Sequence, residues 1–122
     1  MRPTLYLKLS CNQMTLTHVQ SVRTLHLKAD PAFSNARLLA ADFAAAQQLL
    51  QDAVAQLLPR RFLRLSWPPE MLIQPLERLE GGLSQVEERI LLELGLGSGA
   101  RTVRLHLGAE LDSAGVIAKL RR

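Results

Sequence analysis

The chain has 122 residues, 48% of them apolar, which suits one domain with a single hydrophobic core. Its 15 basic and 11 acidic side chains give a formal charge of +4, a milder excess than the dense basic surface of a dedicated nucleic-acid-binding protein. One cysteine, Cys11, excludes an internal disulfide and fits a reducing compartment, and no segment has the apolar length of a signal peptide or a membrane span. We therefore expect a single cytoplasmic domain over residues 1–122.

Three strands are predicted over residues 4–27. From Leu5 to Leu9, leucine alternates with tyrosine and lysine, which is the period of a half-buried strand. The segments MTLTHV and SVRTLHL repeat this alternation, and Gln20-Ser21 separates them. We expect an antiparallel meander.

Helices and strands alternate after residue 38. A helix that ends before Pro59 is predicted by apolar residues at spacings of three and four. These residues are Leu39, Phe43, Ala46, Leu50, Val54 and Leu57. EMLIQPL, residues 70–76, predicts a short strand buried on both faces. A second helix should begin at Ser84, which forms a capping box with Glu87. Its expected buried stripe is Val86, Ile90, Leu91 and Leu94. TVRLHL then predicts a strand, and LDSAGVIAKLRR a last helix capped by Asp112 or Ser113.

The glycine-rich segment GLGSGAR, residues 95–101, raises the question of a phosphate-binding loop. A dinucleotide-binding fingerprint has its glycines after a strand and before a helix, so that helix N–H groups meet the phosphate. Here the glycines follow a helix and precede a strand, where carbonyl oxygens are presented instead. We expect Gly95, Gly97 and Gly99 to form a helix C-cap and turn, with a positive φ among them.

The predicted order, βββαβαβα, indicates an α/β domain with a mixed sheet and packed helices, and the ribonuclease H-like fold has this order. Two stretches, residues 38–57 and 71–105, look like parts of bacterial actins of the rod-shape-determining MreB type. Val86-Glu87-Glu88-Arg89 and Gly97-Ser98-Gly99-Ala100-Arg101 are similar to that family's VERR and GAGAR motifs. The resemblance covers about residues 38–107 and implies one actin-like subdomain, the one called IA, standing alone.

The departures from that family concern nucleotide binding. The resemblance places an Asp-x-Gly-Thr phosphate loop at the first hairpin, where this chain has Lys8-Leu9-Ser10-Cys11. At the position that follows the last strand, where the family has its catalytic carboxylate, the chain has Leu107-Gly108-Ala109, and Glu110 is out of register. The resemblance thus implies that no nucleotide and no cofactor is bound. Nuclease activity is not expected either, because the first strand offers no acids to hold metals.

One basic and aromatic loop, residues 59–69, is the candidate contact site for a partner. Its residues are Arg60, Arg61, Phe62, Leu63, Arg64 and Trp67. Apolar side chains beside arginines suit an anionic membrane surface, and the corresponding loop of MreB-type actins contacts the membrane. Two alternatives remain open: that the apolar residues fold back onto the core, and that the arginines contact nucleic acid, whose phosphates they cannot distinguish from lipid headgroups.

The remaining polar residues have ordinary structural explanations. His18, His26 and His106 lie on predicted strands without a neighbour at metal-ligand spacing, so we expect no metal site. Cys11 has no base beside it in sequence. Most of a group of glutamates should be solvated, on the exposed side of a helix or in the turn before it: Glu77, Glu80, Glu87, Glu88 and Glu93. Asp42 should stabilise the start of its helix through the helix dipole.

Together these observations predict a non-enzymatic, actin-like adaptor or scaffold that binds no nucleotide. It would contact a protein partner or the inner membrane surface as a cytoplasmic or peripheral protein, and nucleic acid is not expected. The alternative is a self-associating structural protein, because a lone subdomain exposes surfaces that its relatives bury. A third class, an enzyme or nucleic-acid-binding protein on the ribonuclease H-like frame, is disfavoured by the missing acids and the mild charge.

Overall fold

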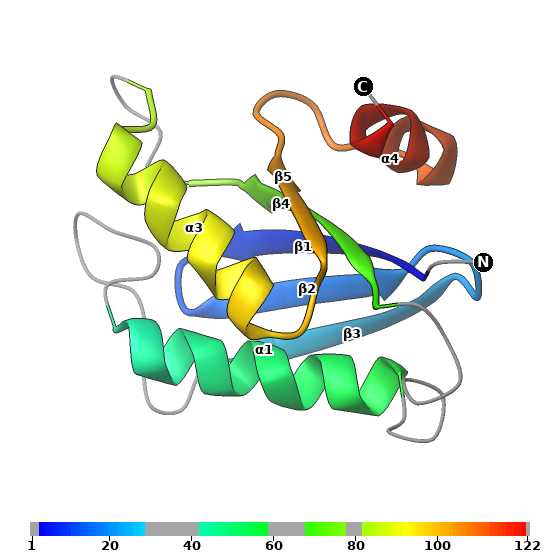
Figure 1. Ribbon diagram of the computed structural model, residues 1–122, viewed down its shortest axis with the longest axis horizontal. Helices are drawn as coiled ribbons and strands as arrows, with labels where there is room; N and C mark the ends of the chain where they lie inside the picture. The colour runs from blue at the N-terminus through cyan, green and yellow to red at the C-terminus, as the bar shows by residue number, and fades with distance from the viewer. Residues whose placement is uncertain (1–2, 29–41, 59–67, 78–81, 122) are drawn as a thin grey trace.

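A single mixed sheet of five strands forms the centre of the protein (Figure 1). The computed structural model describes residues 3–28, 42–58, 68–77 and 82–121. The antiparallel meander consists of β1 (Thr4–Ser10), β2 (Gln13–His18) and β3 (Arg23–Lys28). Next to β1, β4 (Glu70–Pro75) and β5 (Thr102–Leu105) are added in parallel, so the strand order is β3-β2-β1-β4-β5.

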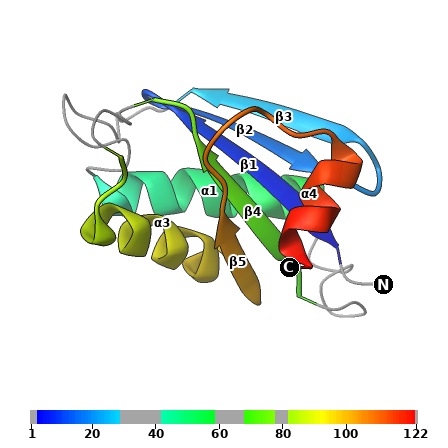
Figure 2. The ribbon, with the colours of Figure 1, turned by 90° about the horizontal axis from the view of Figure 1, so that it is seen from above.

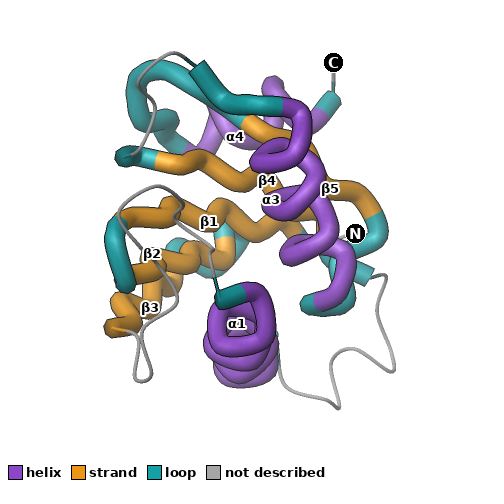
Figure 3. Tube along the Cα trace, turned by 90° about the vertical axis from the view of Figure 1, so that its left-hand side faces the viewer, coloured by secondary structure: helices purple, strands orange, loops and turns teal. Residues whose placement is uncertain are grey.

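Three helices cover the sheet unequally. α1 (Phe43–Leu57) and α3 (Gln85–Gly97) lie on one face, where they pack on each other as well as on the strands (Figure 2). The shorter α4 (Ser113–Leu120) packs against β4 on the other face. Viewed along the strands, α1 lies beneath the meander and α4 stands at the opposite side of the sheet (Figure 3). Over β2 and β3 that second face has no helix among those the structure describes (Figure 3).

The alternation in β1 separates two hydrophobic cores. Leu5, Leu7 and Leu9 point toward α1 and α3 and are fully buried there, in the larger core. Tyr6 points to the other face and joins a small core under α4. That small core consists of Tyr6, Val19, Leu72, Val116 and Leu120. β4 contributes to both cores, which confirms the expectation that this strand is buried on both faces.

The predicted elements are present in the predicted order, with corrections at the helix starts. α1 begins at Phe43, with Asp42 as its N-cap, and Leu39 lies outside the described residues. Asp42 accepts a hydrogen bond from the Ala45 amide, so its role at the helix start is that of a cap. The prediction that Val86 belongs to the buried stripe of α3 is wrong, because its side chain is 68% exposed. Val86 lies in the first turn, before the helix reaches the sheet.

The glycine-rich segment ends α3 and does not form a phosphate loop. The prediction holds for Gly99, which has a φ of +108° in the turn, but Gly95 and Gly97 are helical. A Cβ on Gly95 would lie 2.8 Å from both methyl groups of Val103, so the absent side chain lets α3 approach β5 closely. The Gly95 carbonyl accepts hydrogen bonds from the amide and hydroxyl of Ser98, so the turn itself satisfies it.

Candidate functional site

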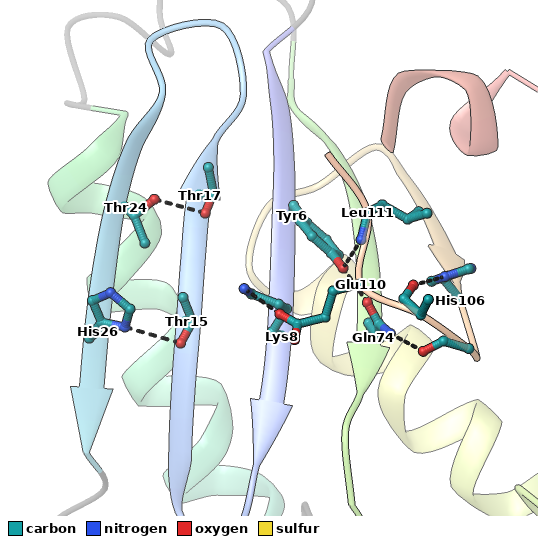
Figure 4. A network of polar contacts seen from close by, with 12 residues as sticks. Tyr6, Lys8, Thr15, Thr17, Thr24, His26, Gln74, His106, Glu110 and Leu111 are labelled. Atoms are coloured by element: carbon teal, nitrogen blue, oxygen red, sulfur yellow. Dashed lines mark hydrogen bonds and ion pairs between the residues drawn. The ribbon is translucent and has the colours of Figure 1, made fainter. Parts of the chain in front are cut away.

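The face of the sheet that carries Tyr6 and α4 is called the open face here, because no described helix covers it over β2 and β3. The first hairpin and the segment after β5 meet on this open face (Figure 4). Lys8, on β1, extends from this face, and its Nζ lies 2.7 Å from Oε1 of Glu110. Both side chains are partly exposed, Lys8 at 25% and Glu110 at 57%. Lys8 occupies the position where the resemblance places the aspartate of the phosphate loop. A cation paired to a carboxylate thus stands in place of the expected acid.

The turn between β1 and β2 is held by a second carboxylate. The Cys11 amide donates to Oε2 of Glu77 over 2.6 Å. Glu77 reaches it because β4 runs parallel to β1, with Pro75 beside Leu9, so both strands end together. Backbone N–H groups in such turns are the donors that bind anions. Here a side chain of the protein supplies the anion.

A buried tyrosine fixes the segment after β5 against the sheet. The Tyr6 hydroxyl donates to Oε1 of Gln74 and accepts from the Leu111 amide over 3.2 Å. Gln74 Nε2 in turn donates to the Gly108 carbonyl over 2.7 Å. Tyr6 is 4% exposed and Gln74 is 1% exposed, so this network is protected from water. It determines where the chain runs as it approaches Glu110.

Each histidine has a local partner. His18 Nδ1 lies 2.8 Å from the Ser21 hydroxyl, and His26 Nδ1 lies 3.3 Å from the Thr15 hydroxyl. His106 Nε2 lies 2.8 Å from the Ala109 carbonyl, so this nitrogen carries the proton and donates. Burial, followed by the nearby Arg23 guanidinium, lowers the pKa of His18. Within the described ranges, no three histidine, cysteine or acidic side chains come together as metal ligands would.

The glutamates do not act as one cluster. Glu87 closes the capping box with Ser84, as predicted, and Glu93 pairs with Arg89 on the exposed side of α3. Glu77 is exposed, as expected, and its carboxylate also accepts a hydrogen bond from the hairpin turn. Glu80 lies outside the described residues.

Most of the candidate contact loop lies outside the described residues. All six of its contact residues lie in the range 59–67, outside the described residues: Arg60, Arg61, Phe62, Leu63, Arg64 and Trp67. The described residues on either side are Leu58, which is buried at the end of α1, and Pro68 and Pro69, which lead into β4. No helix among the described residues combines the length and the apolar character required to cross a bilayer.

Sequence reasoning missed the two carboxylates that complete the site. Glu110 was set aside because it was out of register, yet it pairs with Lys8 from the loop after β5. Glu77 gave no local signal, because its partner is 66 positions away in the chain. The parallel pairing of β1 with β4 would have brought Glu77 to the hairpin, but a sequence pattern alone does not specify which strands pair.

Comparison with known proteins identifies the fold and the family. No protein-family profile matches the sequence. The structure is similar to the crystal structure of the ethanolamine utilization protein EutJ from Carboxydothermus hydrogenoformans, with a TM-score of 0.57 and 14% identity. The match covers 88% of this chain and 37% of EutJ, so the chain spans little more than a third of that protein. EutJ has an actin-like ATPase fold, so the match confirms the α/β, actin-like fold and leaves the MreB type unspecified.

One relative in sequence is the Escherichia coli (strain K12) protein described as "Uncharacterized protein YjaA". It is 40% identical over 125 aligned residues, and the alignment covers 97% of each chain. Such identity over the whole length places both chains in one family. The protein belongs to the YjaA family and has an actin-like fold.

Proposed function

We propose that this protein is a non-enzymatic, actin-like domain that has lost nucleotide binding and acts as an adaptor or scaffold. One observation carries the proposal: the hairpin turn that would face a phosphate already binds the Glu77 carboxylate through the Cys11 amide. A phosphate would have to displace this carboxylate or accept a like charge beside it. Lys8, at the position of the missing acid, is paired with Glu110.

The partner, in this proposal, is a protein or the anionic inner surface of the membrane. The residues that make the contact are those of the basic and aromatic loop: Arg60, Arg61, Phe62, Leu63, Arg64 and Trp67. The composition of these residues supports the assignment, because arginines attract anionic headgroups and the aromatic and leucine side chains enter the membrane interface. A kinship with the MreB type, based on the motifs at 86–89 and 97–101, belongs to the same proposal.

Isothermal titration with Mg-ATP tests the loss of nucleotide binding. We expect no binding heat for the native protein, while an actin-like ATPase that retains its Asp-x-Gly-Thr loop serves as the positive control. Glu77→Gln removes the negative charge from the turn and keeps the shape of the side chain. Micromolar binding of Mg-ATP to the native protein would refute the proposal.

Co-sedimentation with anionic liposomes at low and high salt tests the membrane contact. Binding should require both Phe62 and Leu63, so that Phe62→Ser/Leu63→Ser abolishes it, and it should weaken with salt. Val86→Ser is the matched control, because it removes an apolar side chain that is 68% exposed on α3. Absence of binding at both salt concentrations excludes the membrane and leaves a protein partner.

Self-association is a second candidate, which one feature of the surface favours. In Figure 1, β4 ends and α1 and α3 begin at the same side of the molecule, and an exposed apolar residue belongs to each of these three points of the chain. These residues are Val86, Leu76 and Phe43, exposed at 68%, 37% and 36%. Light scattering over a range of concentrations tests this candidate, and a monomer at the highest concentration would exclude it. Val86→Ser/Leu76→Ser should shift any oligomer toward monomer.

A further inference from the structure

The outer edge of β3 has no partner strand in the part of the chain that the structure describes. Among the described strands β3 pairs with β2 alone, in an antiparallel ladder that matches Arg23 with His18 and Lys28 with Gln13. Its other side therefore presents backbone donors and acceptors to which a further strand can bind. β5, at the opposite edge of the sheet, has four residues, whereas β3 has six. β3 is therefore the longer of the two edge strands.

The two faces of β3 differ in chemistry. Leu25 and Leu27 point toward α1 and are partly buried against the larger core. Thr24, His26 and Lys28 point to the opposite, open face and are exposed. A strand added at this edge would also have one set of side chains on the apolar face and the other set on the open face. Its alternate side chains would extend the apolar layer beside Leu25 and Leu27, and the others would lie beside His26 and Lys28.

The open face carries hydroxyl groups and cations. Cross-strand contacts join Thr17 to Thr24 over 3.0 Å between hydroxyl oxygens, and Thr15 to His26 over 3.3 Å (Figure 4). No aspartate or glutamate occurs in β1, β2 or β3, although the chain contains 11 acidic residues. Lys28 is exposed on this face at one end of β3, and Arg23 is exposed at the other end, on the face of Leu25 and Leu27. The edge is therefore cationic at both ends.

We propose that the β3 edge binds an extended segment of a partner protein in which apolar and acidic residues alternate. The segment would pair with β3 through backbone hydrogen bonds. Its apolar side chains would lie beside Leu25 and Leu27, and its carboxylates would lie near His26 and Lys28 on the open face. This inference rests on the proposed adaptor function and specifies the chemistry of the protein partner.

A second copy of the chain is a poor occupant of this edge. Pairing two β3 strands would bring together two arginines and two lysines, with no carboxylate on either strand to offset them. Like charges on adjacent strands destabilise a sheet. Nucleic acid is also disfavoured, because single strands bind to exposed aromatic side chains, and the described part of this face offers only Tyr6, which is 4% exposed.

The test uses the full chain and a synthetic peptide of six residues, as long as β3, that alternates valine and glutamate. Binding is followed by fluorescence anisotropy and mapped by amide chemical shifts. We expect binding that perturbs β3 amides and weakens with salt. Lys28→Glu should weaken it about tenfold, and a valine–lysine peptide should then bind this variant in preference. Arg101→Glu reverses one exposed charge elsewhere and should leave binding unchanged.

A peptide methylated on alternate backbone nitrogens separates strand pairing from simple charge attraction. It keeps the carboxylates but cannot donate to β3, so its binding should be lost. Undiminished binding of this peptide would overturn the proposal, as would equal affinity for the lysine peptide or shifts confined to residues outside β3. Preferential binding of a single-stranded oligonucleotide would also overturn it. Nucleotide titration and liposome sedimentation do not involve β3, so failure here is distinguishable from failure of the proposed function.

Discussion

Lys8 and Glu110 lie 102 positions apart in the chain and form an ion pair, with 2.7 Å between Nζ and Oε1. Two buried residues, Tyr6 and Gln74, hold the segment that carries Glu110 through hydrogen bonds to Leu111 and Gly108 (Figure 4). Partly exposed ion pairs contribute at most about 1 kcal/mol to stability. The pair therefore adds little to the stability of the fold. Its interest is that Lys8 stands where the resemblance places the acid of a phosphate loop.

Tyr6→Phe should cost more stability than removal of the ion pair. The substitution leaves Gln74 Oε1 and the Leu111 amide without their hydroxyl partner in a buried site, at a cost of roughly 1–3 kcal/mol. Glu110→Gln, the matched control, should cost less than about 1 kcal/mol. Denaturant unfolding measures both values. Equal costs for the two variants would show that the tyrosine network is not the main support of this segment.

Gly95→Ala should destabilise the protein more than Gly97→Ala. A Cβ at Gly95 meets both Val103 methyl groups at 2.8 Å, and Val103 belongs to a packed strand, so a cost of about 1–3 kcal/mol is expected. A Cβ at Gly97 meets the end of the Gln47 side chain, which can move aside at the cost of its hydrogen bond to the Leu94 carbonyl. Thermal unfolding of both variants checks the order, and the reverse order would contradict the observed packing of α3 on β5.

Val22→Asn should stabilise the protein. Val22 has a φ of +56° in the turn between β2 and β3, and its side chain is 73% exposed. A β-branched residue is strained in this left-handed region, whereas asparagine adopts it readily, so a gain of about 1 kcal/mol is expected. The variant loses little packing because the side chain is exposed. The midpoint of urea unfolding measures the gain, and an unchanged or lower midpoint would count against strain at this turn.

The charge state of His18 should make stability depend on pH. Burial, and secondarily the Arg23 guanidinium, lowers the pKa of His18 in the folded protein below its usual value of 6.5. The unfolded chain therefore binds the proton more readily. The contribution of neutral His18 is complete above pH 6.5 and is lost as the pH falls through the lower, folded pKa.

The comparison of native protein with His18→Gln between pH 7.5 and pH 5 measures this effect. The native protein should lose more stability than the variant as the pH falls. Arg23→Gln should reduce the difference without abolishing it, because burial is the larger cause. Parallel pH dependence of the native protein and His18→Gln would show that the two states bind the proton equally.

The local elements could be derived from the sequence because their signals are local. The period of two in β1, the capping box of Ser84 and Glu87, and the glycine after α3 each depend on neighbours within a few residues, and the structure confirms all three. The order of these elements and the motif resemblance were sufficient to predict an actin-like fold. The resemblance also places Lys8 where that family has the acid of its phosphate loop, and the consequence for nucleotide binding stays a prediction.

The tertiary structure decided which distant residues meet. Parallel pairing of β1 with β4 brings Glu77 to the hairpin turn, and the Tyr6 network brings Glu110 to Lys8. No short-range pattern encodes these contacts, because they depend on strand order and on where each strand ends. The same holds for Gly95, because the need for glycine at this position arises only from the close packing of Val103 against it. Local sequence determines what each segment becomes, whereas long-range packing determines which side chains share a site, because contacts between distant residues form only when the whole sheet is assembled.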